Sequence, residues 1–132
     1  MEHYDFILRL LISFMIGLER EIRGSSAGLR TNILVCVGSF LFVSASFNSY
    51  DDMMIIPAQV ISGIGFLGAG FIVINDNKIR GLNTAATMLC VAAIGVLVGL
   101  KLIFEACAGT ILIVFTNIFI RRVKKVLHLI DI

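Results

Sequence analysis

The residues most able to do chemistry in this chain are concentrated in one stretch, GLEREIRGSSAGLRT, at Gly17–Thr31. Its charged residues are Glu19, Arg20, Glu21, Arg23 and Arg30. Carboxylates could bind Mg²⁺, which takes oxygen ligands in near-octahedral geometry. Side chains two positions apart do not face each other on a helix, so the two glutamates alone do not form a cation cage. We therefore expect a network of acids paired with arginines, and no metal site.

Other catalytic or ligating patterns are missing from the sequence. The two histidines, His3 and His128, lie near opposite ends of the chain, and no Ser-His-Asp, Cys-His or phosphate-loop pattern occurs. Cys36, Cys90 and Cys107 lie in apolar stretches without paired spacing, which favours small buried side chains over disulfides or zinc ligands. We expect neither an enzyme nor a cofactor.

Long apolar blocks separate these residues. They cover Phe6–Leu18, Ile33–Phe47, Ala58–Ile74, Leu82–Leu100 and Leu102–Ile120. The chain is 58% hydrophobic and 15% charged, whereas a soluble domain is about half apolar and a quarter charged. About 18 apolar residues suffice to cross a membrane as a helix; the last three blocks approach or meet that length, and the first two need flanking residues. The pattern predicts an all-α polytopic membrane bundle of about five transmembrane helices.

The basic residues predict the orientation of this bundle. Nine of the eleven lie in the first and third connections or after the last block, and an excess of Lys and Arg marks cytoplasmic loops. We therefore expect the N-terminus outside and the C-terminus in the cytoplasm. Residues 1–120 would form the transmembrane domain, and residues 121–132 a basic cytoplasmic tail that attracts anionic lipid at about 1 kcal/mol per basic residue.

Small residues predict how the helices pack. The stretch SGIGFLGAGFIV, Ser62–Val73, is rich in glycine, and small residues let helices approach closely in a membrane. We expect this third helix to be central, with the glycines of GVLVG, Gly95–Gly99, docking against it. We also expect Thr31 and Asn83 to cap the helices that begin there.

The tripeptide Ile-Arg-Gly occurs twice, at Ile22–Gly24 and Ile79–Gly81. Each copy follows a helix that enters the cytoplasmic side and precedes one that leaves it. This order is typical of a parallel repeat related by an axis along the membrane normal.

Three strings, GLEREIRGSSAGLRTNILVCVGS, QVISGIGFLGAGFIV and IRGLNTAATMLCVAAIGVLVGL, resemble the membrane domain of the MgtC/SapB family. The resemblance runs from about Gly17 to Leu100, in the same order and spacing. By position it places the family's signature on Glu19, Arg20, Gly28, Leu29, Arg30, Thr31, Gln59, Ser62, Gly63, Gly65, Phe66, Gly68, Ala69, Gly70, Arg80, Gly81, Asn83, Thr84 and Ala85. Many relatives carry a soluble, ACT-like C-terminal domain. We expect a short form without it, so no ligand sensing by that domain is carried over.

The resemblance implies a multi-pass protein of the bacterial inner membrane. Such proteins are associated with growth at limiting magnesium and, in pathogens, with survival in host cells. The first hypothesis is an accessory or regulatory protein that acts through another membrane protein or its own copies, with no nucleic-acid partner. The alternative is a channel or transporter for magnesium or another cation, formed by one chain or by an oligomer. Against it, no apolar block carries an acid near the membrane midplane.

Overall fold

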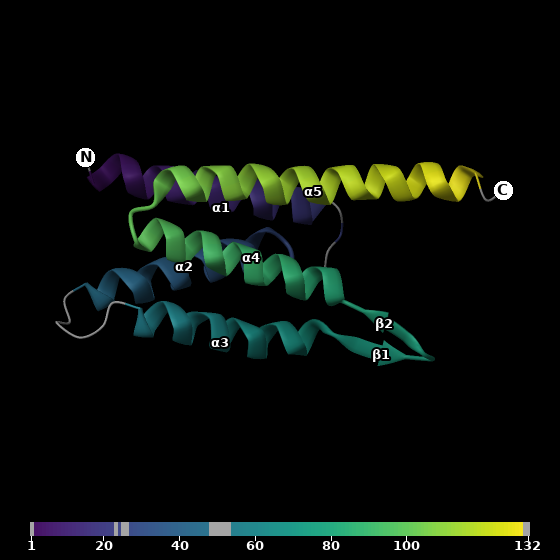
Figure 1. Ribbon diagram of the computed structural model, residues 1–132, viewed down its shortest axis with the longest axis horizontal. Coiled ribbons are helices and arrows are strands. Elements are labelled where there is room, and N and C mark those ends of the chain that lie inside the picture. Colours follow the sequence, from purple (N-terminus) through teal and green to yellow (C-terminus); the bar gives the residue numbers. More distant parts are fainter. Residues whose placement is uncertain (1, 23, 25–26, 48–53, 131–132) are drawn as a thin grey trace.

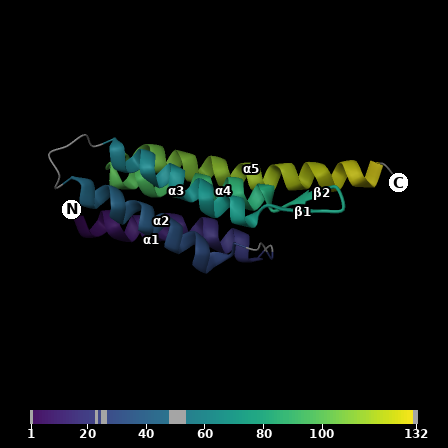
Figure 2. The same ribbon diagram turned by 90° about the horizontal axis from the view of Figure 1, so that it is seen from below.

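In the part of the chain that the structure describes, five helices form a bundle with one short hairpin (Figure 1). A computed structural model describes residues 2–22, 24, 27–47 and 54–130. The helices are α1 (Glu2–Ile22), α2 (Leu29–Ser46), α3 (Ile55–Phe71), α4 (Leu82–Gly99) and α5 (Ile103–Ile130), and the strands are β1 (Val73–Asn75) and β2 (Lys78–Arg80). Successive helices run in opposite directions along the bundle (Figures 1 and 2). The all-α prediction is confirmed, apart from the hairpin.

Three of the described helices are long and apolar enough to cross a membrane. They are α2, α4 and the Ile103–Leu127 part of α5. Helix α3 is equally apolar in character but has 17 residues, and α1 carries charged residues at both ends. The structure thus supports a membrane protein with three spans, while five spans and their orientation stay predictions.

Helix α4 is the centre of the bundle, which corrects the expectation that α3 would be. Its residues Val91, Ile94 and Val98 pack with residues of α1, α2 and α5 in one core cluster. Its residues Ala92 and Val96 pack with α2 and α3 in a second cluster. The other helices therefore assemble around α4.

The glycines of α4 explain this arrangement. Gly95 lies against the backbone carbonyl of Cys36 and the side chain of Ser39, and a Cβ at Gly99 would come within 2.7 Å of the Val43 side chain. Four positions apart, these glycines share one face of the helix, and that face meets α2. The two glycines of GVLVG thus dock on α2, not on α3 as expected from the sequence, while Val96 between them packs with both helices.

The third apolar block ends earlier than its hydropathy predicts. Helix α3 ends at Phe71, and Val73 and Ile74 belong to strand β1. Asp76 and Asn77 both adopt the left-handed conformation, with φ of 46° and 61°. A two-residue turn with positive φ at both positions matches the twist of a hairpin, so the chain reverses there and does not continue as helix.

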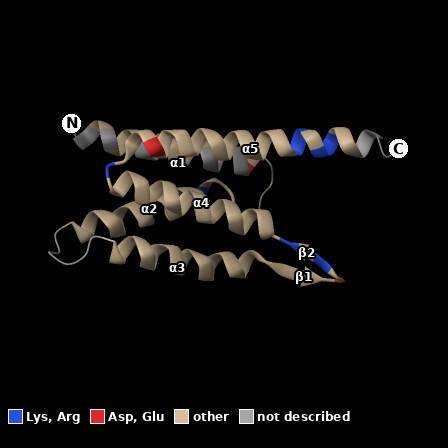
Figure 3. Ribbon diagram, in the orientation of Figure 1, with Lys and Arg blue, Asp and Glu red and all other residues tan. Residues whose placement is uncertain are grey.

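Basic residues of β2 and of the last part of α5 lie toward one end of the bundle (Figure 3). Strand β2 contributes Lys78 and Arg80, and α5 continues unbroken through Arg121, Arg122, Lys124 and Lys125. Lys101 and Glu105 lie at the opposite end, around the connection of α4 to α5. That this end faces the cytoplasm stays a prediction.

Candidate functional site

Glu21, in the last turn of α1, caps the beginning of α2. Its Oε2 accepts a hydrogen bond of 2.8 Å from the backbone N–H of Leu29, eight residues further along the chain. The first N–H groups of a helix lack intrahelical acceptors and carry partial positive charge, so a carboxylate stabilises them. The charged stretch found in the sequence therefore joins two helices through a charge-assisted hydrogen bond.

Gly28 is the N-cap residue of α2 and lies directly beside this carboxylate. A Cβ at Gly28 would overlap Oε2 of Glu21. The glycine thus lets the carboxylate approach the helix terminus, and a side chain there would displace the end of the Glu21 side chain from its capping position. Glu19 and Arg20 lie in the same turn region of α1, but their side chains, like the residue Arg23, are outside the described structure, so their predicted pairing stays a prediction.

Asn32 holds the turn that precedes α2. It is fully buried, and its Nδ2 donates to the carbonyl oxygens of Ala27 at 2.8 Å and Gly28 at 2.7 Å. Its Oδ1 is also buried and has no partner in the described part of the chain. Thr31, expected to be the cap, instead lies inside the first turn of α2. Asn32 opens the second apolar block beside Thr31 in the sequence, and the expectation placed the cap on Thr31 instead of on this buried amide.

Gly81 performs a corresponding task at the beginning of α4. It is the N-cap residue, its φ is 82°, and a Cβ there would overlap the carbonyl oxygen of Phe71 at the end of α3. Only glycine adopts this conformation without strain. Gly24, the other glycine of an Ile-Arg-Gly tripeptide, also has positive φ, at 63°. The two tripeptides therefore share a glycine conformation, and the parallel repeat stays a prediction.

The remaining signature residues near Gly81 begin α4. Asn83 and Thr84 lie in its first turn, so Asn83 is not the N-cap that was expected. The carbonyl of Asn83 accepts a hydrogen bond of 2.9 Å from Oγ1 of Thr87. Arg80 precedes them, exposed at the end of β2.

The hairpin that carries Arg80 has two chemically different faces. Its register pairs Val73 with Arg80, Ile74 with Ile79, and Asn75 with Lys78. Because directly opposite residues share a face, Lys78 and Arg80 lie on one side and the two isoleucines on the other. Sequence reasoning placed this segment partly in a helix; the alternation around Asn-Asp-Asn is the signal that predicts a hairpin.

The glycines of α3 divide into packed and open positions. A Cβ at Gly68 would make an ordinary contact of 3.5 Å with Ala85 of α4, whereas one at Gly63, Gly65 or Gly70 would meet nothing within 4 Å. Ser62 is exposed and its hydroxyl bonds its own helix, at the Ala58 carbonyl. The signature glycines of this helix therefore do not all serve packing within one chain.

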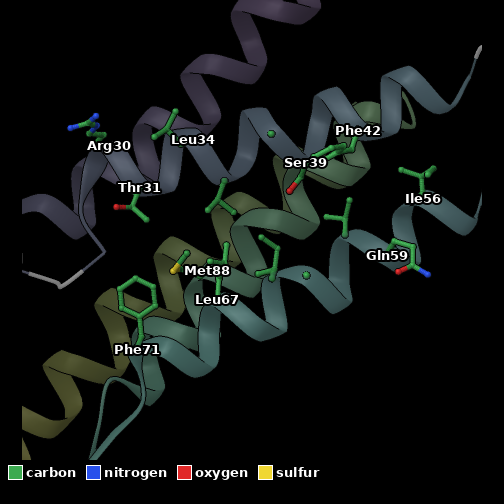
Figure 4. Close-up of a pocket in the computed structure, with 15 residues that line it drawn as sticks. Arg30, Thr31, Leu34, Ser39, Phe42, Ile56, Gln59, Leu67, Phe71 and Met88 are labelled. Carbon is green, nitrogen blue, oxygen red and sulfur yellow. The ribbon is translucent and has the colours of Figure 1, made fainter.

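A groove of 1090 Å³ lies between α2 and α3, with Met88 of α4 at its base (Figure 4). Arg30 and Thr31 lie at one end and Gln59 at the other. Gly63 lines the groove between them. Four signature residues are thus brought together along one groove, while Ser62, Gly65, Gly68, Gly70, Arg80, Gly81, Asn83 and Thr84 lie outside its lining.

Neither the acids nor the cysteines form a cluster in the described structure. Among the side chains described, no three His, Cys, Asp or Glu lie together as metal ligands. None of the three cysteines forms a disulfide in the described structure. Cys36 is buried and Cys107 partly buried, but Cys90 is exposed on α4, contrary to expectation.

Comparison with known proteins gives a consistent result. The model of the MgtC family matches residues 6–126. The chain is 46% identical over 122 residues to Protein MgtC of Salmonella typhimurium strain LT2, covering 92% of this chain and 53% of that protein. It is 46% identical over 120 residues to Protein MgtC of Brucella abortus strain 2308 (89% and 50%), and 44% identical over 134 residues to an uncharacterized protein of Synechocystis (97% and 57%).

The chain spans about half the length of the curated relatives it matches. No solved structure matches it.

Proposed function

The chain belongs to the MgtC family, and on that premise we propose that it is an accessory or regulatory protein of the bacterial inner membrane. It supports magnesium homeostasis and growth at low magnesium, and in a pathogen it contributes to virulence. It catalyses no reaction and acts through a membrane partner, either another protein or further copies of itself.

The β1–β2 hairpin is the observation that carries this proposal. Ile74 and Ile79 are 73% and 60% exposed, although they form a directly opposed apolar pair. An exposed apolar pair extending beyond the helices is suited to contact with another protein or with the membrane surface. Lys78 and Arg80 on the opposite face add positive charge, which favours a partner with acidic residues at the cytoplasmic edge of its membrane helices.

The position of the hairpin suits it to transmit a contact with a partner to the helix bundle. It connects α3 directly to the central helix α4, and Gly81 fixes its exit against Phe71. A partner that binds the hairpin would therefore contact the segment joining the two helices and not a freely moving loop. Regulation by contact needs such a rigidly placed surface.

Complementation of growth at low magnesium tests this proposal. The host is a bacterium that lacks its own family member, and it expresses the full chain or the double variant Lys78→Glu/Arg80→Glu. We expect the variant to insert normally but to restore no growth, because the charge that attracts the partner is reversed. Lys101→Glu, at the other end of the bundle, is the matched control and should restore growth fully. Wild-type growth with the double variant would overturn the proposal.

A cation channel is the second candidate, and the groove is the observation that favours it. Thr31, Ser39 and Gln59 place polar groups along its length. Arg30 at one end repels cations, which weakens this candidate. Magnesium flux through the purified protein separates the two functions.

A further inference from the structure

The groove between α2 and α3 has one charged end and an otherwise apolar body. Arg30 lies at one end, and the opposite end carries the neutral amide of Gln59 (Figure 4). Leucine, isoleucine, valine, phenylalanine, methionine and glycine make up most of the lining between them. An occupant that matches this lining has a single negative group and a long apolar tail.

The walls of the groove leave space for such a tail. Gly38 of α2 and Gly63 of α3 line opposite walls, and a Cβ at either position would meet nothing within 4 Å. Leu34 and Phe42 along the α2 wall are 61% and 65% exposed. The groove therefore opens sideways from the bundle, and no described part of the chain covers it.

The charged end offers several groups that suit a phosphate. The Arg30 guanidinium can bind a phosphate through two hydrogen bonds. The backbone N–H groups of Arg30 and Thr31, in the first turn of α2, have no acceptor in the described structure, and helix N-termini favour anions. Glu21 accepts from Leu29, so its carboxylate leaves the next two N–H groups open. It also places a negative charge at the same helix terminus, and the Arg30 guanidinium must therefore supply most of the attraction for an anion.

The length of the groove matches one leaflet of a bilayer. Arg30 and Phe42 at its two ends along α2 are about 18 Å apart at the rise of an ideal helix. Half of the hydrocarbon core is about 15 Å. A lipid whose headgroup lies at Arg30 would thus place its acyl chain along most of the groove within one leaflet.

We propose that this groove binds an anionic phospholipid, with its phosphate at Arg30 and Thr31 and one acyl chain between α2 and α3. The site is separate from the hairpin on which the proposed function rests. It also differs from general attraction of anionic lipid to the basic tail, because it requires the apolar groove as well as the charge.

Native mass spectrometry of the full chain in detergent tests the proposal, with phosphatidylglycerol and phosphatidylcholine as probes. We expect one phosphatidylglycerol per chain, bound about fivefold more tightly than phosphatidylcholine. Both lipids carry the phosphate, but the choline cation cancels the net charge of phosphatidylcholine and is repelled by Arg30, and the attraction of anionic lipid to one basic residue is about 1 kcal/mol. Arg30→Gln should remove the preference. Arg122→Gln, in the tail, is the matched control and should keep it. Equal affinity for the two lipids in the wild-type chain would overturn the proposal, as would an unchanged preference in Arg30→Gln.

Variants of the groove walls test the place of the acyl chain. Gly38→Leu and Gly63→Leu should each lower the affinity for phosphatidylglycerol about tenfold or more, because the new side chain occupies part of the groove and its Cβ has open space at both positions. Ala45→Leu, exposed on α2 and outside the lining, should leave it unchanged. Circular dichroism and gel filtration check that each variant is folded. Unchanged lipid affinity in both glycine variants would overturn the groove as the site.

Variants at Ser39 and Gly38 distinguish a lipid from a protein helix as the occupant of the groove. Its side chain is 3% exposed and lines the groove. An acyl chain offers no hydrogen bond, so Ser39→Ala should bind phosphatidylglycerol as the wild type does. A second copy of the chain in the groove would instead give disulfide-linked dimers with Gly38→Cys in membranes. If Gly38→Cys forms such dimers and Ser39→Ala loses lipid binding, the occupant of the groove is a second copy of the chain and not a lipid.

Discussion

The carboxylate of Glu21 accepts a hydrogen bond from the backbone N–H of Leu29, at 2.8 Å, and so joins the end of α1 to the beginning of α2. The charged stretch of the sequence is thus in part a structural joint. Glu21, at the end of α1, stabilises the N-terminus of α2, and Gly28 leaves room for its carboxylate because it has no Cβ.

Loss of this cap should destabilise the bundle modestly. We expect Glu21→Ala to lower the free energy of unfolding by about 1 kcal/mol, as does removal of other caps. Glu21→Gln keeps an acceptor oxygen and should cost less. Thermal unfolding in detergent measures both. Asp76→Asn, which replaces an exposed acid by its amide in the hairpin turn, is the control and should change little; a similar loss there would show that the effect is not specific to the cap.

Gly28 and Glu21 should be energetically coupled. In the wild-type chain, Gly28→Ala should destabilise because the new Cβ overlaps the carboxylate. In a Glu21→Ala background the overlap disappears, so the same substitution should cost less by about 1 kcal/mol, within the range known for contacting residues. A double-mutant cycle on unfolding free energies gives this difference. Strict additivity would contradict the contact.

Asn32, and not Thr31, should be the polar residue on which the turn before α2 depends. Asn32→Ala removes two hydrogen bonds to backbone carbonyls and should cost about 1–3 kcal/mol. Asn32→Asp, which lacks the donor, should be at least as destabilising. Thr31→Ala should have a much smaller effect. Chemical unfolding in detergent compares the three, and equal losses for Thr31→Ala and Asn32→Ala would contradict the hydrogen-bond pattern.

Gly81 should tolerate no side chain, in contrast to Gly70. Gly81→Ala combines a φ of 82° with an overlap on the Phe71 carbonyl, and the conformation alone costs about 1–2 kcal/mol. Gly70→Ala, with open space around its Cβ, should be neutral or stabilise α3 by about 0.5–1 kcal/mol through helix propensity. The amount of folded protein extracted from membranes and its melting temperature measure both. A well-folded Gly81→Ala protein would contradict the described turn.

Hydropathy predicted the five helices because a long apolar run marks a segment whose backbone polar groups must find hydrogen bonds within the segment itself. A helix meets this requirement locally, without help from distant parts of the chain. It failed at Val73 and Ile74, whose apolar character continues the run of α3 although the chain is already extended. The conformation there is decided by Asp76 and Asn77, so turn residues overrode hydropathy.

Packing was harder to predict because glycine content does not say which face meets which neighbour. Helix α3 is richer in glycine, yet Gly63, Gly65 and Gly70 face open space, whereas Gly95 and Gly99 of α4 lie on one face against α2. The cap was missed for a related reason. Glu21 acts on Leu29 across a turn between two helices, and local rules for helix starts search only the residues next to the cap.

The groove could be predicted only in part. Arg30, Thr31, Gln59 and Gly63 were recognised as signature residues, but they belong to two helices whose relative placement follows from packing on α4. Ser39 and Met88 carry no signal of their own in the sequence. Their importance appears only when α2, α3 and α4 are assembled.

Magnesium flux into liposomes that contain the purified full chain tests the central claim, regulation and not transport, most directly. Fluorescence of an internal magnesium indicator reports the flux, and liposomes with Gly63→Leu, which narrows the groove, serve as the comparison. The account predicts the same slow entry with wild-type protein, with the variant and without protein. Entry that increases with the amount of wild-type protein and is abolished by Gly63→Leu would contradict it and establish a cation path along the groove.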